Sequence, residues 1–189
     1  MSPIPIAGPA VEPVTLAEAK AYLRLESEHE DALVESLVAA ARRTLELATR
    51  RAFLAQTWRV TVEGRPGSRA VALPFAPALE IVAVRVTSAS GSLATLAAEL
   101  YRLDDAADPP RLSMLADLPG SGAGPGSIEI DARYGFGSEA ADVPEPIRLA
   151  ILRLVACWFE RRGDAGDGSG GLPADVQALI APFVRARIA

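Results

Sequence analysis

The side chains that most often do chemistry in proteins are scarce in this chain, which has one histidine, His29, and one cysteine, Cys157. His29 lies in the acidic stretch 26–31, and no partner for a catalytic triad or a histidine-bearing metal site stands out in the sequence. Cys157 lies within a strongly apolar stretch, where a thiol packs as a small core side chain. We therefore expect a solvated His29 and a structural Cys157.

Three other stretches invite a binding-site interpretation, but each lacks a part of the site. The glycine-rich run 120–126 lacks the Lys-Ser/Thr end of a phosphate-binding loop and the spacing of a dinucleotide fingerprint. Asp164 and Asp167 lack the ligand spacing and the closing glutamate of a calcium loop. An acidic turn is expected to be solvated, with a weak cation site as the alternative: Asp104, Asp105 and Asp108. The sequence thus predicts no catalytic residues, no cofactor, no metal site and no enzyme.

Composition narrows the class of protein further. A chain of 189 residues, half of them apolar, can bury a core without disulfides or metals. A net charge of −5 argues against sequence-independent binding of nucleic acid, which requires a basic surface. The N-terminus lacks both a positive region and a sustained apolar run, so no signal peptide is predicted and the expected compartment is the cytoplasm.

The most apolar element is a predicted helix over residues 146–160. At 100° per residue its large apolar side chains share one side: Ile147, Ala150, Ile151, Leu154, Val155 and Trp158. Leu149 and Ala156 make the opposite side weakly apolar as well. Pro144 and Pro146 suit a helix start. Such a helix belongs at the centre of a bundle, and its arginines and its length exclude a membrane span.

Two earlier helices are predicted. Thr15 and Glu18 form a capping box for a short helix, and Ser27 and Glu30 suggest a second one for a long helix over 29–50. The apolar arc of this long helix covers about half its circumference, enough to meet two partners. The arc has one edge with Leu33, Leu37, Ala41, Thr44 and Ala48, and another with Val34, Val38 and Leu45.

The middle of the chain changes to the alternating pattern of strands. Predicted strands span 56–62, 70–73, 80–87, 101–103, 111–115 and 127–134, with turn-rich segments between them. Their spacing favours a small antiparallel sheet or barrel over a parallel βαβ sheet. A last helix begins near Pro173, and Pro182 must disturb it because proline lacks an N–H.

The fold class expected is α+β, a helical bundle of about four helices with a β-rich insertion between the second and third long helices. The predicted domains are an extended N-terminal arm over 1–14, a bundle from 15–55 and 141–181, an insertion over 56–140 and a tail over 182–189. Residues 163–171 are expected to be a flexible Gly/Ser linker.

In order and spacing, these motifs resemble the head-to-tail connector (adaptor) proteins of long-tailed phages and gene transfer agents. The matching stretches are 13–24, 30–42, the Gln56-Thr-Trp58 strand start, Leu73-Pro74 with Pro77, Tyr134–Gly137, Val143–Arg148 and 172–185. Each motif alone is weak, but together they cover most of residues 13–185. The stretches 104–126 and 163–171 depart from the family pattern.

The resemblance implies a structural protein that acts without catalysis. Family members form a ring of the portal's symmetry beneath the dodecameric portal and join it to the stopper and tail. DNA passes through the central channel. The implied partners are copies of this chain in a ring, expected to be a dodecamer, the portal protein, a stopper or tail-proximal protein, and duplex DNA without sequence-specific binding. No membrane partner is expected. The implied location is the bacterial cytoplasm during assembly and then the particle neck.

Two surfaces follow as hypotheses from the residues. The apolar anchors and arginines near the C-terminus suit a docking element for the portal: Leu179, Ile180, Phe183, Val184, Arg185 and Arg187. The alternative is that this segment packs on its own bundle. Four carboxylates could line the channel and let duplex DNA slide: Glu26, Glu28, Glu30 and Asp31.

Other functions remain open alternatives. One is another structural protein of the tail interface, such as a stopper. A second is a DNA-packaging accessory that binds DNA through a basic face, which could include Arg42, Arg43, Arg50 and Arg51.

Overall fold

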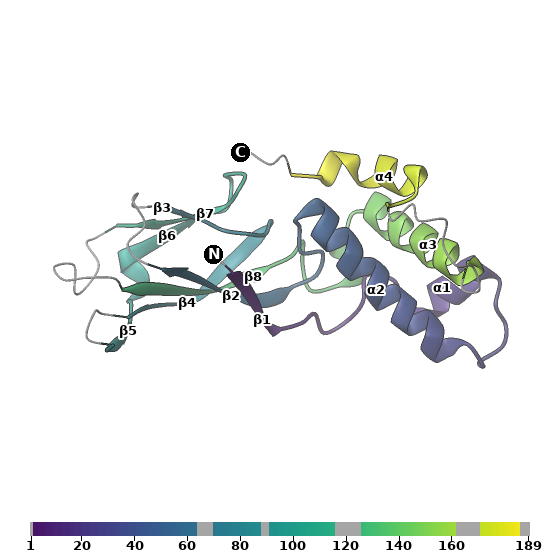
Figure 1. Cartoon of the computed structure of the whole chain (residues 1–189), viewed down its shortest axis with the longest axis horizontal. Coiled ribbons are helices and arrows are strands. Elements are labelled where there is room, and N and C mark those ends of the chain that lie inside the picture. Colours follow the sequence, from purple (N-terminus) through teal and green to yellow (C-terminus); the bar gives the residue numbers. More distant parts are fainter. Residues whose placement is uncertain (1, 64–69, 88–90, 116–125, 162–170, 186–189) are drawn as a thin grey trace. The chain divides into compact units, whose positions relative to one another are not determined.

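A computed structural model describes residues 2–63, 70–87, 91–115, 126–161 and 171–185. The chain is α+β, as predicted, and divides into two compact units (Figure 1). The strand unit comprises Met1–Ala10 and Ala55–Phe136, and the helical unit comprises Val11–Leu54 and Gly137–Ala189.

The helical unit contains four α-helices and two short 3-10 helices within the described residues. They are α1 (Leu16–Leu23), α2 (Asp31–Thr49), η2 (Ala140–Asp142), α3 (Glu145–Glu160), α4 (Ala174–Ile180) and η3 (Ala181–Phe183). The predicted effect of Pro182 is confirmed, because α4 gives way to η3 at that point.

The predicted capping box of α1 is present. The Glu18 backbone N–H donates to Thr15 Oγ1, and the Thr15 N–H donates to the Glu18 carboxylate at 2.8 Å. The predicted box at the start of α2 is wrong. Glu30 is the N-cap and makes no side-chain capping bond, and Ser27 instead accepts from the His29 N–H. The helix consequently begins at Asp31, two residues later than predicted.

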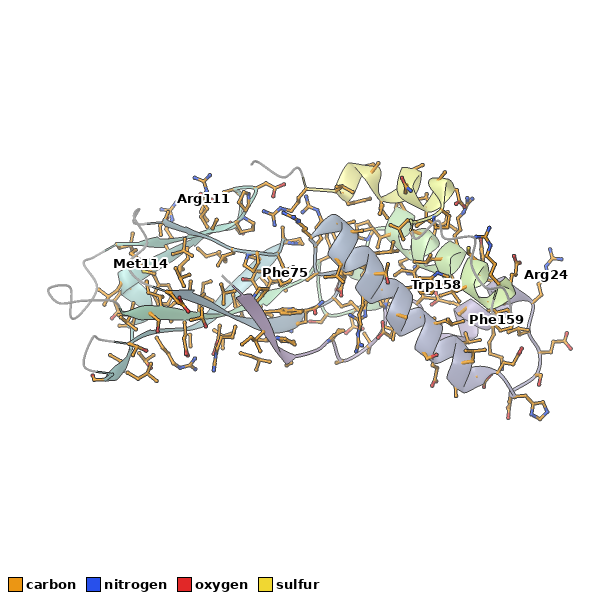
Figure 2. The ribbon with its side chains drawn as sticks, viewed as in Figure 1. Arg24, Phe75, Arg111, Met114, Trp158 and Phe159 are labelled. Carbon is orange, nitrogen blue, oxygen red and sulfur yellow. The ribbon has the colours of Figure 1, made fainter. Side chains whose placement is uncertain are left out.

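Helix α3 supplies the largest share of the helical core. Five of its predicted inward side chains are buried: Ile147, Ala150, Ile151, Leu154 and Val155. Trp158, expected among them, is only half-buried near the end of the helix (Figure 2). Each large aliphatic side chain removed from water stabilises the fold by about 1.5–3 kcal/mol.

Within the described residues, the strand unit contains two antiparallel sheets. The five-stranded sheet has the order β1-β2-β8-β4-β5, and the three-stranded sheet has the order β3-β7-β6. The strands are β1 (Ser2–Ala7), β2 (Gln56–Glu63), β3 (Ala70–Ala72), β4 (Ala78–Thr87), β5 (Leu93–Thr95), β6 (Tyr101–Asp104), β7 (Arg111–Met114) and β8 (Ser127–Tyr134). A short 3-10 helix, η1 (Ala98–Leu100), precedes β6.

Strand β8, paired with both β2 and β4, shows the alternation that organises the larger sheet. Ile128, Ile130 and Tyr134 are buried on one face. On the other face Asp131 bridges two neighbouring strands, with Arg59 Nε 2.7 Å from Oδ1 and Arg85 Nη1 2.6 Å from Oδ2. Hydrogen bonds from Arg59, partly opposed by desolvation, lower the pKa of Asp131. This carboxylate therefore links three strands by charge.

Two strands were not predicted. The proline-rich segment expected as an extended arm contains β1, which pairs with β2 as an edge strand. Pro3 and Pro5 remove two backbone donors from β1, which discourages further pairing at a sheet edge. The very short strand β5 pairs with the end of β4.

The structure shows the exposure of most of the residues that the sequence offered as candidates for catalysis or metal binding. His29 is exposed, as expected, and Cys157 is half-buried. Among the three carboxylates of the acidic turn, Asp104 is half-buried and Asp105 and Asp108 are exposed. The run 120–125 and the aspartates 164 and 167 lie outside the described residues.

In the described part of the chain no helix combines the length and the apolar character needed to cross a membrane. No cluster of three or more His, Cys, Asp or Glu placed to hold a metal occurs there either.

Candidate assembly surfaces

The predicted docking segment begins in α4, and the structure distributes its residues over different environments. Ile180 is buried in the helical unit, and Leu179 and Phe183 are half-buried. Val184 is the most accessible apolar side chain of the set, with 47% of its surface exposed. Arg187 lies outside the described residues.

Two hydrogen bonds to backbone atoms of this segment hold it against the end of α2. Arg51 Nε donates to the carbonyl oxygen of Phe183 at 2.7 Å, a short hydrogen bond strengthened by the guanidinium charge. The backbone N–H of Arg185 donates to the carbonyl of Thr49 at 3.3 Å. The chain as far as Arg185 is therefore held on its own unit, while Val184 faces solvent.

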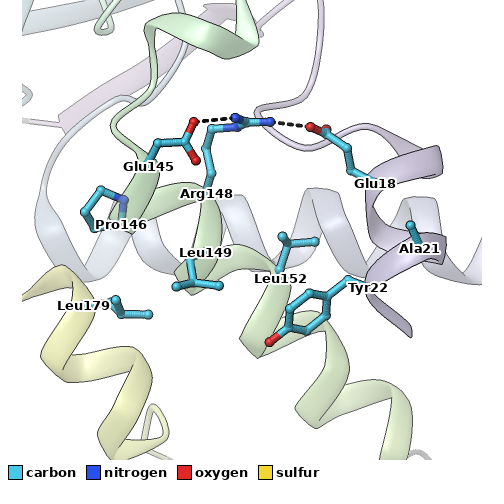
Figure 3. A pocket seen from close by; sticks show the side chains of 9 residues that line it. All are labelled: Glu18, Ala21, Tyr22, Glu145, Pro146, Arg148, Leu149, Leu152 and Leu179. Carbon is cyan, nitrogen blue, oxygen red and sulfur yellow. Dashed lines mark hydrogen bonds and ion pairs between the residues drawn. The ribbon is translucent and has the colours of Figure 1, made fainter. Parts of the chain in front are cut away.

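Next to α4 the helical unit has an open groove of about 630 Å³ between α1, α3 and α4 (Figure 3). Its lining is mainly apolar: Ala21, Tyr22, Pro146, Leu149, Leu152 and Leu179, with Glu18, Glu145 and Arg148 at the polar end. Among the predicted docking residues that the structure describes, only Leu179 lines it. The groove was not anticipated, because its walls come from helices that are far apart in the sequence.

The polar end of the groove is an ordered ion cluster. Arg148 donates to the carboxylates of Glu18 and Glu145 and to the carbonyl of Pro13. The backbone hydrogen bond from Thr15, together with the charge of Arg148, lowers the pKa of Glu18. Glu18 therefore stays ionised near neutral pH, and the cluster has one guanidinium for two carboxyl groups.

The four predicted channel carboxylates lie in and after the α1–α2 turn. Glu26 and Glu28 are exposed, and Glu30 is half-buried. Asp31 forms an ion pair with Lys20, with Nζ 2.6 Å from Oδ1. Two of the four, Glu26 and Glu28, thus present their charge to solvent.

In the structure, Arg42 does not contribute to the basic face considered for DNA binding. Arg42 is buried and binds Glu12 and Glu46, so its charge is neutralised inside the unit. Arg51 is engaged with Phe183. The two other arginines of that face, Arg43 and Arg50, are exposed.

Part of this chain matches a known protein family. The family described as phage gp6-like head-tail connector protein matches residues 13–92. A search among curated proteins found no match.

Chains in three solved structures are similar to this protein. Each match covers 100% of this chain and 98% of the other chain. A chain in the neck of an empty gene transfer agent (GTA) particle, computed with C6 symmetry, has 27% identity and a TM-score of 0.83. A chain in the virion of a native GTA particle has 28% identity and a TM-score of 0.80. A chain in the neck of a native GTA particle, computed with C12 symmetry, has 26% identity and a TM-score of 0.73. The resemblance of this chain to the head-to-tail connector proteins of phages and gene transfer agents is thereby confirmed.

Proposed function

We propose that this protein is a structural head-tail connector (adaptor) subunit that forms a ring beneath the portal. The ring joins the DNA-filled head of a phage or GTA particle to the stopper and tail. The observation that carries the proposal is the full-length similarity to chains from GTA necks. A connector of this kind works by binding neighbours and catalyses no reaction.

The expected ring has twelve copies. One of the similar neck structures was computed with C12 symmetry, and a dodecameric portal offers twelve equivalent sites. In a closed ring each subunit contacts its two neighbours through two different surfaces. Apart from β1, the strand unit is then an insertion into the helical bundle, since β2 to β8 fall between α2 and α3 in the chain.

The C-terminal segment is proposed to dock on the portal. Val184 is exposed, and the backbone bonds to Arg51 and Thr49 hold it in a defined place. Phe183 and Leu179 are half-buried and could complete an apolar contact, while Arg185 could pair with a portal carboxylate. Ile180 contributes from within the unit by supporting this segment.

Glu26 and Glu28 are proposed to line the channel, with Glu30 and Asp31 behind them. Exposed carboxylates repel the phosphate backbone, so duplex DNA could pass without sticking. The Asp31–Lys20 ion pair reduces the contribution of Asp31.

Mixing the protein with a matching portal tests the proposal. Negative-stain microscopy should show an added ring on the tail-facing end of the portal. The proposal would be overturned if this protein did not bind the portal even at concentrations well above those present during particle assembly. Assembly is expected in the cytoplasm of the bacterial host, before the ring becomes part of the particle neck.

A further inference from the structure

The outward side of α2 carries an uncharged stripe, here called the α2 stripe: Leu33, Leu37, Ala40, Thr44 and Leu47. At 100° per residue these five positions fall within an arc of about 80°. Leu47 has 74% of its surface exposed, Leu33 has 38%, and Ala40 is also exposed. The stripe therefore presents apolar surface to solvent along most of the helix.

The fold of the single chain covers this stripe only in part, because Leu37 and Thr44 are half-buried and the other three residues are exposed. The neighbouring face of α2 is already buried in the helical unit through Val34, Val38 and Leu45. One side of α2 thus packs within the subunit, and the α2 stripe beside it stays largely accessible. Contiguous exposed apolar surface of this kind marks interaction sites.

The same unit has a concave surface that complements the stripe. The groove between α1, α3 and α4 has an apolar floor that includes Leu149 and Leu152, with Tyr22 on its wall (Figure 3). An open groove beside packed helices can accept the ridge of another helix.

The charges around the two surfaces are also complementary. Arg43 and Arg50 are exposed and lie on the side of the α2 stripe that faces away from the buried half. The groove ends in Glu18 and Glu145 around Arg148, an excess of one negative charge. Opposite charges of this kind favour one orientation of a contact.

We propose that the α2 stripe of one copy packs into the α1–α3–α4 groove of the next copy around the ring. This inference rests on the proposed ring and names its subunit contact. Both surfaces belong to the helical unit, and they are different, as a ring contact between identical subunits requires. Leu47 enters the apolar part of the groove, and Arg43 or Arg50 lies near Glu145.

Leu47→Glu tests the contact with little effect on the subunit itself. Leu47 is about three-quarters exposed, so the monomer should unfold at the same temperature within a few degrees. Ring formation on the portal should fall at least about tenfold, because the groove would have to bury a carboxylate beside other carboxylates. Leu93→Glu, an equally large apolar side chain with 58% exposure in β5, is the matched control and should form rings normally.

Cysteine crosslinking tests which molecule occupies the groove. In a Cys157→Ser background, Leu47→Cys and Ala21→Cys in one chain should give a ladder of covalent oligomers under mild oxidation on the portal. The variant with either cysteine alone should give no ladder beyond dimers.

The outcomes separate this inference from the ring proposal. If wild type forms rings and Leu47→Glu forms them equally well, the ring stands and this contact is wrong. Crosslinking within one chain, or from Ala21→Cys to the portal, would also overturn it. If wild type forms no ring on the portal under any condition, both proposals fail.

Discussion

Arg42 of α2 forms a bidentate ion pair with Glu12, which lies thirty residues earlier in the chain. Its Nε is 2.7 Å from Oε2, and its Nη2 is 3.1 Å from Oε1. Its Nη1 also donates to Glu46 at 2.9 Å. Glu46 in turn accepts from the backbone N–H of Phe53. Burial alone would lower the Arg42 pKa, but its two carboxylate partners raise it. Arg42 and Glu46 together thus tie the segment before α1 and the segment after α2 to the same helix.

Replacing Arg42 should destabilise the protein more than replacing its neighbour Arg43. Arg42→Met leaves the buried Glu46 carboxylate and Glu12 without their cation, at a cost of about 3 kcal/mol in the free energy of unfolding. Arg43→Met removes an exposed charge and should cost less than about 0.5 kcal/mol. Urea denaturation measures both. Equal effects of the two substitutions would contradict a structural role for the Arg42 cluster.

The bridge from Asp131 to Arg59 and Arg85 predicts a pH-dependent stability. The pKa of Asp131 is lowered in the folded state, so its contribution is complete above the unfolded value of about 4 and disappears as the pH falls through the folded value. Asp131→Asn should reduce the free energy of unfolding by about 2 kcal/mol at pH 7. The difference between variant and wild type should begin to shrink below about pH 4, where Asp131 of the unfolded wild type protonates, and should vanish below the lower pKa of the folded state, where folded Asp131 also becomes neutral. A difference that is constant from pH 7 to pH 3 would show that the charge is unimportant.

Unlike the two substitutions above, removing the hydroxyl group of Tyr134 should not reduce the stability of the protein. Its ring packs edge-on against Phe75, with ring centroids 5.7 Å apart. Its buried hydroxyl has no hydrogen-bond partner among the residues that the structure describes, and burial raises its pKa. Tyr134→Phe should therefore leave stability unchanged or raise it by up to about 1 kcal/mol. A loss of more than about 1 kcal/mol in thermal or urea denaturation would mean that the hydroxyl makes a stabilising bond.

Removing residues 182–189 should separate folding from docking. The deletion removes Phe183 and Val184 but keeps the buried Ile180, so the helical unit should remain folded, with a reduction in melting temperature of a few degrees. Circular dichroism checks the fold, and co-sedimentation with the portal checks docking, which should be lost. Normal incorporation of the truncated protein into portal-containing particles would disprove the docking role.

Elements with strong local signals could be predicted from the sequence. The apolar pattern of α3 and the Thr15–Glu18 capping box act over a few residues, and both are found in the structure. Strands β2 and β8 alternate clearly and lie within about one residue of their predicted bounds. These patterns were sufficient for the α+β class.

Features that depend on distant residues could not be predicted. Nothing near Arg42 indicates that Glu12 will neutralise it, so the sequence suggested Arg42 as a possible member of a basic face. The proline-rich start becomes β1 only because β2 lies beside it. The groove requires three helices to meet, and Tyr22, Leu149 and Leu179 carry no local sign that they share a wall.

The most direct test of the account is the rotational symmetry of the complex of this protein with its portal, measured from end-on class averages in electron microscopy. The account predicts one continuous added ring of twelve subunits around an open channel. Isolated copies scattered on the portal, or a compact plug that closes the channel, would contradict it.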